Sequence, residues 1–531
     1  MNRKLYILVI ALLLFQSYLF SQTLTVETNF GTNGRTLTSF GSNDSNLGSL
    51  AIQSDGKIIA CGSYYDSFIN QMIISRYNTN GTIDTTFGTN GKAIAQVGTP
   101  LDNEYNSVKV LSSGKILVSG TNYNTILGFQ FFVIRYNQNG TLDASFGTNG
   151  TLFSNLGFST WGTALQIQSD NKFIVAGKIT ENSSDGYTDF FLVRYNENGT
   201  LDSGFGTNGI AKINIGTASN SSAQSEDILS CLNLQTDGKI LASGSTNNGS
   251  DYGNFALTRL NTNGSIDTTF GNNGKVITDF GQSTEVRTLH ILPDNTIIAS
   301  GNYYYNADSN QKAVTAKYNA NGTLDSSFGT AGKVITDLNG AVDGGLIFSS
   351  EILANGKLLL FGYINGSSDS DFLMIRYTTN GSIDNTFGTN GFLTTDFGTN
   401  EGAFSSLTQP DGKIIVGGGT YNTVSGAVDF TLLRYTIDAL STIDFKKEPL
   451  LAYPNPFTNS ITINFDLDNN DVFDIDLYDI NGRKVKNLLS TTSFNAGNTT
   501  RTLAVPENLV HGNYLLKITS SNESKVLKMV K

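Results

Sequence analysis

The sequence predicts an all-β protein, in which a seven-bladed β-propeller is followed by a small antiparallel β-sandwich. Three observations lead to this prediction: a unit of about 59 residues recurs seven times, each unit contains four strand-like pieces, and the composition suits strands and turns. The 531 residues include 56 Gly, 22 Tyr and 33 Phe, and only 15% are charged. Such a composition favours short strands joined by tight turns over long helices.

Three columns of residues recur at matching positions and define the repeats. A Phe-Gly pair opens the same segment at Phe30, Phe87, Phe146, Phe205, Phe270, Phe328 and Phe387. A basic residue followed by Tyr or Leu occurs at Arg76, Arg135, Arg194, Arg259, Lys317, Arg376 and Arg434. A third column lies at the turn before an apolar run: Lys57, Lys115, Lys172, Lys239, Thr296, Lys357 and Lys413. Each column has seven members, which indicates seven repeats.

Each repeat contains four strand-like pieces, named strands a to d in chain order. Strand a, illustrated by residues 50–53, is followed by an Asp-Gly turn. Strand b is almost continuously apolar, as in residues 58–61, which suits a strand buried on both faces. Strand c ends in the Arg-Tyr pair, as in residues 132–136. An Asn-Gly turn, in which both residues tolerate positive φ, then leads through the Phe-Gly element into strand d.

Seven units of four antiparallel strands are what a seven-bladed β-propeller requires. A β-solenoid normally uses far fewer residues per repeat, and a sandwich does not explain so regular a count. The last repeat ends at Arg434-Tyr435 without a Phe-Gly element, whereas residues 25–31 align with residues 82–88. We therefore expect residues 23–40 to form strand d of the last blade and to close the ring, which pairs both open edges.

The N-terminus has the features of a secretory signal peptide over residues 1–21. Asn2-Arg3-Lys4 supplies the positive charge, residues 5–20 the apolar run, and Ser21-Gln22 a cleavage point. An uncleaved membrane anchor is the alternative, but the run is short for a span. No other stretch is apolar enough to span a membrane as a helix, so we expect no transmembrane helix in the mature chain. Since no Cys follows the apolar run, a lipoprotein anchor is not indicated.

Charge and cysteine content exclude two further features. The net charge of −11 and the pI near 4.8 oppose binding to phosphate backbones, so nucleic acid is not an expected partner. Cys61 and Cys231 belong to repeats far apart and to different strand types. We therefore expect no disulfide between them and interpret both as small buried apolar residues.

The pattern changes after Tyr435. Residues 436–450 are expected to form a linker, and residues 451–531 a smaller unit that begins with Tyr453-Pro454-Asn455-Pro456. Alternating strands are predicted at residues 460–465, 474–479 and 514–518. A small antiparallel sandwich fits this pattern.

The repeats resemble the delta-60 repeat of secreted bacterial proteins over about residues 24–435. The matching signature is Arg-Tyr-Asn, Asn-Gly-Thr-Leu-Asp, Phe-Gly-Thr-Asn-Gly and Asp-Gly-Lys. Leu260, Lys317 and Asn295-Thr296 depart from it without changing the count. The resemblance implies a propeller-like architecture and no established activity.

The C-terminal unit resembles the sorting domain of type IX secretion substrates. The residues that carry the match are Tyr453, Pro454, Asn455, Pro456, Gly512, Tyr514 and Lys528, together with residues 479–483. The resemblance implies that the type IX machinery is a partner and that the chain crosses the outer membrane. The protein is then secreted or on the cell surface, with the sorting domain often removed.

An acidic column also repeats, at Glu27, Asp84, Asp143, Asp202, Asp267, Asp325 and Asp384. A catalytic pair is needed once, whereas a structural residue is needed in every blade. We therefore expect these carboxylates to bond turns and to pair with the basic column, and the lysine column to be solvated. His290 is expected to face solvent, because its column is mostly polar. No catalytic triad, His/Cys metal cluster or phosphate-binding loop is present, so no catalytic residue is predicted.

The b–c and d–a connections differ in every repeat and emerge together at one face, whereas the repeated turns emerge at the other. Aromatic and acidic side chains in these variable connections are the candidate binding residues: Tyr64, Tyr65, Asp102, Trp161, Tyr187, Tyr252, Tyr304 and Asp369. Such side chains suit glycan or protein recognition in an adhesion or scaffolding protein. They are equally consistent with merely hydrophilic loops. The alternative function is a polysaccharide hydrolase that uses loop carboxylates. Neighbouring carboxylates could also hold Ca²⁺, and no other cofactor is indicated.

Overall fold

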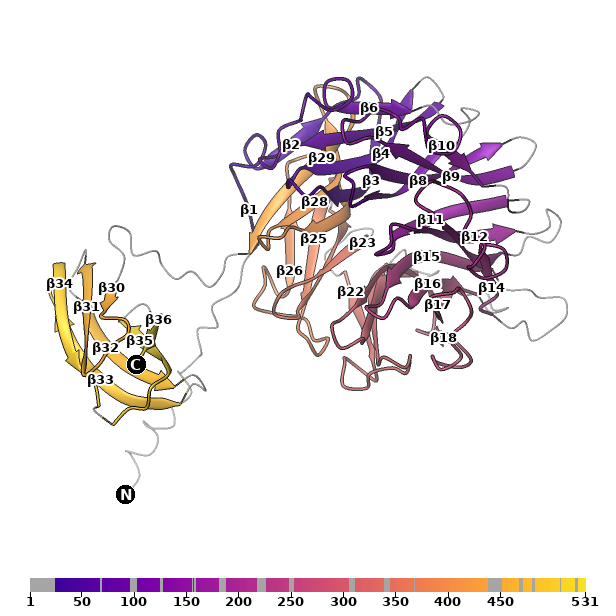
Figure 1. Cartoon of the computed structure of the whole chain (residues 1–531). Helices are drawn as coiled ribbons and strands as arrows, with labels where there is room; N and C mark the ends of the chain where they lie inside the picture. Colours follow the sequence, from indigo (N-terminus) through magenta and orange to yellow (C-terminus); the bar gives the residue numbers. More distant parts are fainter. Residues whose placement is uncertain are drawn as a thin grey trace. The chain divides into compact units, whose positions relative to one another are not determined.

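The structure is a computed structural model of the whole chain (Figure 1). It describes residues 24–66, 69–95, 103–124, 128–154, 156, 159–180, 188–216, 226–247, 253–304, 311–338, 344–366, 368–437, 451–467, 471–479, 483–506, 508–520 and 524–531. The expected signal peptide and residues 438–450 of the expected linker lie outside these residues. All regular elements of the described residues are strands. These residues contain no helix that is long and apolar enough to cross a membrane. The chain divides into two units, residues 1–437 and 438–531.

The first unit is a propeller of seven antiparallel sheets, which confirms the predicted all-β fold and the seven blades. Blade 1 contains β3 (Ser45–Ile52), β4 (Ile58–Asp66), β5 (Ile69–Tyr77) and β6 (Lys92–Ala95). Blade 2 contains β7 (Asn103–Val110), β8 (Ile116–Asn124), β9 (Gly128–Tyr136) and β10 (Thr151–Phe153). Blade 3 contains β11 (Ser159–Ile167), β12 (Phe173–Thr180), β13 (Asp189–Tyr195) and β14 (Ile210–Ile213). Blade 4 contains β15 (Asp227–Leu234), β16 (Ile240–Thr246), β17 (Asn254–Leu260) and β18 (Lys275–Thr278).

The remaining blades follow the same order. Blade 5 contains β19 (Ser283–Ile291), β20 (Ile297–Tyr304), β21 (Lys312–Tyr318) and β22 (Lys333–Asp337). Blade 6 contains β23 (Gly345–Ile352), β24 (Leu358–Asn365), β25 (Ser370–Tyr377) and β26 (Phe392–Thr395). Blade 7 contains β27 (Glu401–Thr408), β28 (Ile414–Asn422) and β29 (Ala427–Ile437), with β1 (Leu24–Val26) and β2 (Arg35–Thr38) sharing its outer position.

The first strand of each blade lies innermost. These strands contact one another around the ring, and β27 contacts β3 to complete the circle. The hydrophobic clusters form between successive blades: Ile59 and Ile74 of blade 1, for example, pack with Val118 and Phe132 of blade 2. Because strands b and c are covered by a neighbouring blade on each side, they are apolar on both faces, as their continuous runs predict.

The expected ring closure is confirmed. Leu24, Thr25 and Val26 of β1 pair with the end of β29, and all four residues of β2 pair with residues 430–433 of the same strand. Figure 1 shows β1 and β2, near the indigo end of the colour scale, beside the orange β29. The outer edge of the last sheet is therefore covered by the start of the chain, in agreement with the sequence alignment.

The two Asn-Gly pairs of a repeat form different turns. The first closes the predicted hairpin, since Asn78 hydrogen-bonds to Thr82 and Tyr77 bridges Ile83 across it. In the turn after strand c, Gly81 has a φ of +85° but Asn80 is not left-handed, which fits a bulged turn with glycine at the left-handed position. In the Phe-Gly element, Asn90 and Gly91 both have positive φ, and Thr89 and Lys92 exchange backbone hydrogen bonds. This second pair is the turn in which both residues adopt positive φ.

One blade departs from this turn chemistry. Ala331 has a φ of +51° where six other blades place Asn. An alanine in the left-handed region costs about 1–2 kcal/mol more than in a right-handed one, and Asn tolerates the region better. We expect A331N to increase the free energy of unfolding by about 0.5–1 kcal/mol, measured by urea denaturation. The reverse substitution N390A, at the matching turn of the next blade, should lower it; a loss of stability in A331N would contradict the argument.

The second unit is an antiparallel sandwich. One sheet contains β30 (Leu451–Tyr453), β31 (Ser460–Leu467) and β34 (Gly497–Ala504), with β31 in the centre. The other contains β33 (Lys484–Phe494), β32 (Asp471–Asp479), β35 (Asn513–Thr519) and β36 (Ser524–Val530), in that order. Apolar side chains from both sheets, such as Ile461 and Leu516, form a single core between them.

Candidate functional site

The repeated signature forms a polar contact between neighbouring blades, which we call the clasp: the basic, acidic and lysine columns with the Phe-Gly element. In blade 1, Asp84 Oδ2 accepts hydrogen bonds from Arg76 Nε at 2.8 Å and lies 2.9 Å from Lys57 Nζ, while Oδ1 accepts from the backbone and hydroxyl of Thr86. Arg76 also donates at 2.6 Å to the carbonyl oxygen of Gln138 in the next blade. Burial alone raises the pKa of Asp84, but the hydrogen bonds from Thr86 and Lys57 and the nearby Arg76 outweigh it and lower this pKa well below its usual range.

This arrangement recurs around the ring. In all seven blades the acidic residue lies 2.7–3.1 Å from the basic residue of its own repeat, which confirms the predicted ion pairing. The lysine column was predicted to be solvated, and this was wrong. Its six lysines lie 2.7–3.0 Å from the same carboxylates. A lysine stem can cross the apolar surface beside the turn and reach a partner that sequence spacing does not indicate.

The clasp also explains the Phe and Gly of the signature. The guanidinium of Arg76 lies 4.7 Å above the ring of Phe87, and five other blades repeat this contact. The other side of the ring meets the next blade: a Cβ on Gly140 would lie 2.9 Å from Phe87. Gly140 thus needs both its positive φ and its missing side chain. The conspicuous motif of the chain therefore belongs to the scaffold.

The inner strands carry a second polar row, and His290 belongs to it. His290 was expected to face solvent, but its Nε2 lies 2.7 Å from Ser350 Oγ of the next blade, and burial lowers the pKa of His290 to about 4. In the same position of blade 3, Gln166 donates to the carbonyl oxygen of Leu232. Glu351 in blade 6 accepts from hydroxyls of blade 7, and burial raises its pKa. A column of polar residues on the inner strands can thus link neighbouring blades. From sequence alone, such a column looks the same as one that faces solvent.

The predicted binding residues do not form one group. Tyr64 is 9% exposed and stacks on Phe40 within a hydrophobic cluster, whereas Tyr65 is 48% exposed. The backbone carbonyl of Asp369 accepts a hydrogen bond from Gly366 in a turn. Asp102, Tyr187 and Tyr252 lie outside the described residues.

Trp161, the single tryptophan of the chain, lies in an aromatic group between blades 2 and 3. Its ring is 4.5 Å from that of Phe129, which also contacts Tyr123. Lys178 Nζ lies 4.7 Å above the indole. Trp161 is half-buried, so this group forms a partly accessible platform near the start of the inner strand of blade 3.

A second group, which we call the bulge cluster, contains Tyr304 and five residues that were not predicted. It consists of Glu285, Arg287, Tyr304, Phe348, Tyr363 and Phe404. Tyr304 donates its hydroxyl to Glu285, Arg287 pairs with Glu285, and the guanidinium lies over the ring of Phe348 in the next blade at 5.5 Å. Phe348 in turn contacts Tyr363 and Phe404, so the cluster extends over blades 5, 6 and 7.

β-Bulges produce this cluster. Every inner strand skips one residue in its pairing with the second strand of the blade. The skipped residues are Gly48, Asn106, Thr163, Ser230, Arg287, Phe348 and Phe404. Bulges redirect a side chain and are frequent next to functional sites. Blades 1 to 4 have a small or polar residue at the bulge, and blades 5 to 7 have a large one. The ring is therefore asymmetric at the bulge position. Aligning the repeats position by position would have revealed this difference, but the bulge itself leaves no mark in the sequence.

Three carboxylates converge where blades 6 and 7 meet. Oxygen atoms of Asp371, Asp396 and Glu401 all lie within 4.8 Å of one another. Burial, and the neighbouring Asp396, raise the pKa of Asp371, and burial raises that of Glu401. Glu401 nevertheless accepts from the backbone of Phe397 and Thr399. Asp227 of blade 4 lies at the position equivalent to Glu401 and likewise accepts a backbone hydrogen bond, from Ile215. Glu401 therefore caps a loop, which is a structural role.

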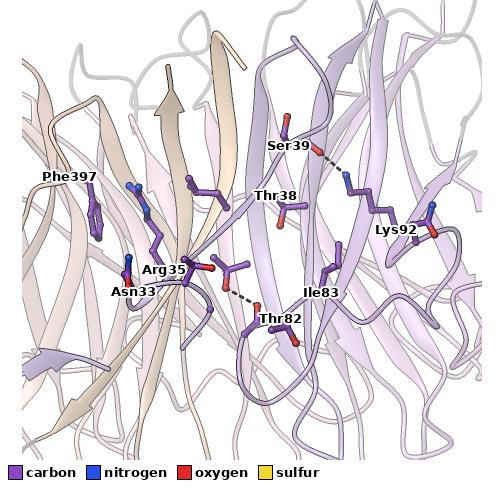
Figure 2. A pocket seen from close by; sticks show the side chains of 14 residues that line it. Asn33, Arg35, Thr38, Ser39, Thr82, Ile83, Lys92 and Phe397 are labelled. Atoms are coloured by element: carbon purple, nitrogen blue, oxygen red, sulfur yellow. Dashed lines mark hydrogen bonds between the residues drawn. The ribbon is translucent and has the colours of Figure 1, made fainter. Parts of the chain in front are cut away.

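The best-defined groove in the described residues follows the outer side of the ring closure (Figure 2). It has a volume of about 720 Å³ and is lined by Arg35, Lys92 and Phe397 among others. Lys92 Nζ donates to the carbonyl oxygen of Ser39, and Thr36 donates to that of Gly81. Smaller grooves of about 530 and 270 Å³ lie at equivalent positions between other blades. Because it repeats with the blades, we interpret this groove as part of the scaffold.

In the second unit, the residues of the expected sorting motif meet around the C-terminal strand. Asn455 donates to the carbonyl oxygen of Lys528 at 3.0 Å and accepts from the backbone of Val530 at 2.8 Å. The backbone of Gly512 bonds with Lys531. Tyr514, which is 5% exposed, contacts the ring of Phe457, the residue that follows Pro456. Tyr453, with Pro454 directly after it, is 47% exposed. The motif at the start of the second unit, residues 453–456, is therefore bonded to the last strand of the chain.

Comparison with protein families agrees with both units. The DUF5122 β-propeller, a domain of unknown function, matches residues 53–87, 111–146, 168–205, 235–270, 292–328, 353–387 and 409–438. The secretion system C-terminal sorting domain matches residues 451–531. No curated protein sequence matches the chain.

Among solved structures, three similar chains have low identity and low TM-scores. A protein of unknown function from Dyadobacter fermentans is 11% identical with a TM-score of 0.43, covering 76% of this chain and 99% of its own. An inactive virginiamycin B lyase from Staphylococcus aureus is 10% identical with a TM-score of 0.41, covering 75% and 98%. PorZ from Porphyromonas gingivalis is 7% identical with a TM-score of 0.25, covering 97% and 87%. Scores at this level transfer no property to this chain.

Proposed function

Because the chain is a DUF5122 β-propeller protein with a secretion system C-terminal sorting domain, we propose that its propeller binds extracellular ligands at the face of the variable connections. The sorting domain assigns the chain to type IX secretion and to the cell surface or the extracellular space. In the proposal, residues 1–21 are the signal peptide and residues 22–435 the binding domain. The binding role is adhesion or scaffolding through recognition of glycans or surface proteins.

The bulge cluster carries this proposal. A scaffold contact recurs in every blade, as the ion pair between the basic and acidic columns does, whereas a binding site is needed only once. The cluster occurs in three consecutive blades. Its aromatic side chains and Glu285 are half-buried and Arg287 is exposed, so none of them is sealed in the core. Aromatic rings that keep a polar neighbour and remain partly exposed are typical of binding surfaces. The Trp161 platform supplies a second surface of the same chemical type.

The test is binding by the full mature chain. The labelled protein is screened on a glycan panel and used to capture partners from a bacterial surface fraction. A retained ligand should slow backbone hydrogen exchange at the starts of β19, β23 and β27 and leave the signature turns unchanged. Failure to retain any glycan or surface protein, or protection confined to the signature turns, would contradict the proposed function.

The alternative is a polysaccharide hydrolase that uses the carboxylates of blades 6 and 7. Glycosidases place two carboxyl groups about 5–10 Å apart, one of them free to exchange a proton. Oxygen atoms of Asp371, Asp396 and Glu401 lie within 4.8 Å of one another, which is closer than this range, and Glu401 is engaged by backbone donors as a loop cap. This arrangement favours binding over hydrolysis. Release of reducing sugar by the mature chain, abolished in D371N, would instead support the enzyme.

A further inference from the structure

We infer that the bulge cluster binds a neutral hexopyranose unit of a glycan. The inference rests on the proposed function and specifies its ligand. A pyranose ring offers C–H groups on its faces and hydroxyl groups around its rim. Its recognition needs an aromatic surface with a hydrogen-bond donor and an acceptor at the edge. The cluster provides all three.

The acceptor and donor come from one ion pair. Glu285 Oε1 accepts from Arg287 Nε at 2.7 Å, lies 2.5 Å from Nη2, and also accepts from the hydroxyl of Tyr304. Among the described residues, no hydrogen bond reaches Glu285 Oε2. The guanidinium has five N–H donors; two of its nitrogens contact Glu285, and it also interacts with the Tyr304 hydroxyl, so N–H donors remain for a ligand. The side chains of Glu285 and Arg287 are 28% and 37% exposed. An acceptor oxygen and spare N–H donors thus lie side by side, as neighbouring hydroxyls of a sugar require.

The aromatic surface adjoins this pair. The guanidinium of Arg287 lies 5.5 Å above the ring of Phe348. Phe348 stacks on Tyr363 with centroids 6.0 Å apart and meets the ring of Phe404 edge-on at 5.2 Å. Three rings from blades 6 and 7 therefore hold one another in place. Because these rings are fixed before a ligand arrives, little side-chain entropy is lost on binding.

Charge selects the neutral sugar. The opposite charges of Glu285 and Arg287 cancel. Burial alone lowers the pKa of Arg287, but the charge of Glu285 and the Tyr304 hydroxyl outweigh it and raise this pKa, so Arg287 keeps its charge. The whole chain carries a net charge of −11, which repels an anionic polysaccharide at long range. We therefore expect a neutral hexopyranoside to bind more tightly than the matching uronide.

The test uses the full mature chain and defined sugars. Methyl hexopyranosides of gluco, manno and galacto configuration, and the methyl glucuronide, are titrated by ligand-observed NMR. At least one neutral glycoside should bind the native chain. E285Q and F348A should each weaken it about tenfold or more. S230A, which changes the bulge residue of blade 4, should leave binding unchanged. Melting temperatures of all variants establish that a loss of binding is not a loss of folding.

The outcomes separate this inference from the proposed function. Equal binding by native chain, E285Q and F348A would place the sugar elsewhere and overturn the inference, as would tighter binding of the glucuronide. If the chain binds only partners without a hexopyranose and these protect β19, β23 and β27 from exchange, the ligand class is wrong but the proposed function stands. If no ligand of any kind binds, both fail.

Discussion

Removal of residues 22–40 is expected to lower the free energy of unfolding of the propeller by about 6–10 kcal/mol. The segment supplies Phe30, which is fully buried, and loss of such a side chain costs about 3–5 kcal/mol. It also supplies Glu27, the partner of Arg434 and Lys413. Leaving a buried charge unpaired costs a further 3–5 kcal/mol or so. The outer edge of β29 would be exposed in addition.

Trp161 makes the measurement specific, because it is the only tryptophan and lies in the propeller. Thermal unfolding followed by its fluorescence reports the propeller without the sorting domain. The matched control lacks residues 438–531 and should melt at the native temperature.

The converse experiment joins the two ends of the ring by a disulfide. Thr25 and Thr436 have hydroxyls 3.0 Å apart and are separated by 411 residues of sequence, so the oxidised form of T25C/T436C should melt above its reduced form. An unchanged melting temperature after removal of residues 22–40 would show that this closure does not hold the ring.

D384A is expected to cost about 3–5 kcal/mol, because it leaves Arg376, which is fully buried, without its carboxylate. Asp384 Oδ2 lies 2.7 Å from both Arg376 Nε and Lys357 Nζ. The matched control is D325A in blade 5, where Lys317 replaces arginine and both side chains are 17–18% exposed. The pair in blade 5 is more hydrated, and the lysine column has Thr296 there, so D325A should lower the free energy of unfolding by only about 1 kcal/mol. Urea denaturation followed by Trp161 fluorescence measures both.

The effect of Asp384 should also depend on pH. Burial alone raises its pKa, but hydrogen bonds from Lys357 and Thr386 and the charge of Arg376 outweigh it and lower the pKa to about 2. Since the folded-state pKa is below the unfolded value of 3.8, the stabilisation is complete above that value and is lost as pH falls towards 2. The stability difference between the native chain and D384A should therefore shrink over this range. Equal costs for D384A and D325A at neutral pH would contradict the role of burial.

Much of the fold could be predicted because the repeats are tied to local chemistry. Periodic Phe-Gly and Arg-Tyr pairs gave seven blades, and the Phe-Gly element missing after Tyr435 located its replacement at Phe30. The carboxylate column was assigned to structure because it recurs in each repeat. The surroundings of the lysine column and of His290 could not be predicted in this way. Their partners lie across a turn or in the next blade, and the sequence gives no distance between such groups.

The candidate site was predicted only in part. Tyr304 was selected as an aromatic residue in a variable connection, but Tyr64 was selected on the same grounds and packs in the core. Arg287, Phe348 and Phe404 could not be predicted as site residues, because they lie within strands, where an isolated large residue fits the ordinary strand pattern. Their common position follows from a bulge, which is a property of pairing between strands.

Sequence alone predicts the blade count, the start of the chain as the closing strand, and the sorting domain. These depend on local turn chemistry and on periodicity, both of which are linear properties of the chain. Which polar columns face inward, and which bulge residues meet, depends instead on how the blades pack in three dimensions. Residues such as Arg287 and Phe348, 61 positions apart, become neighbours only when the inner strands of adjacent blades pack side by side.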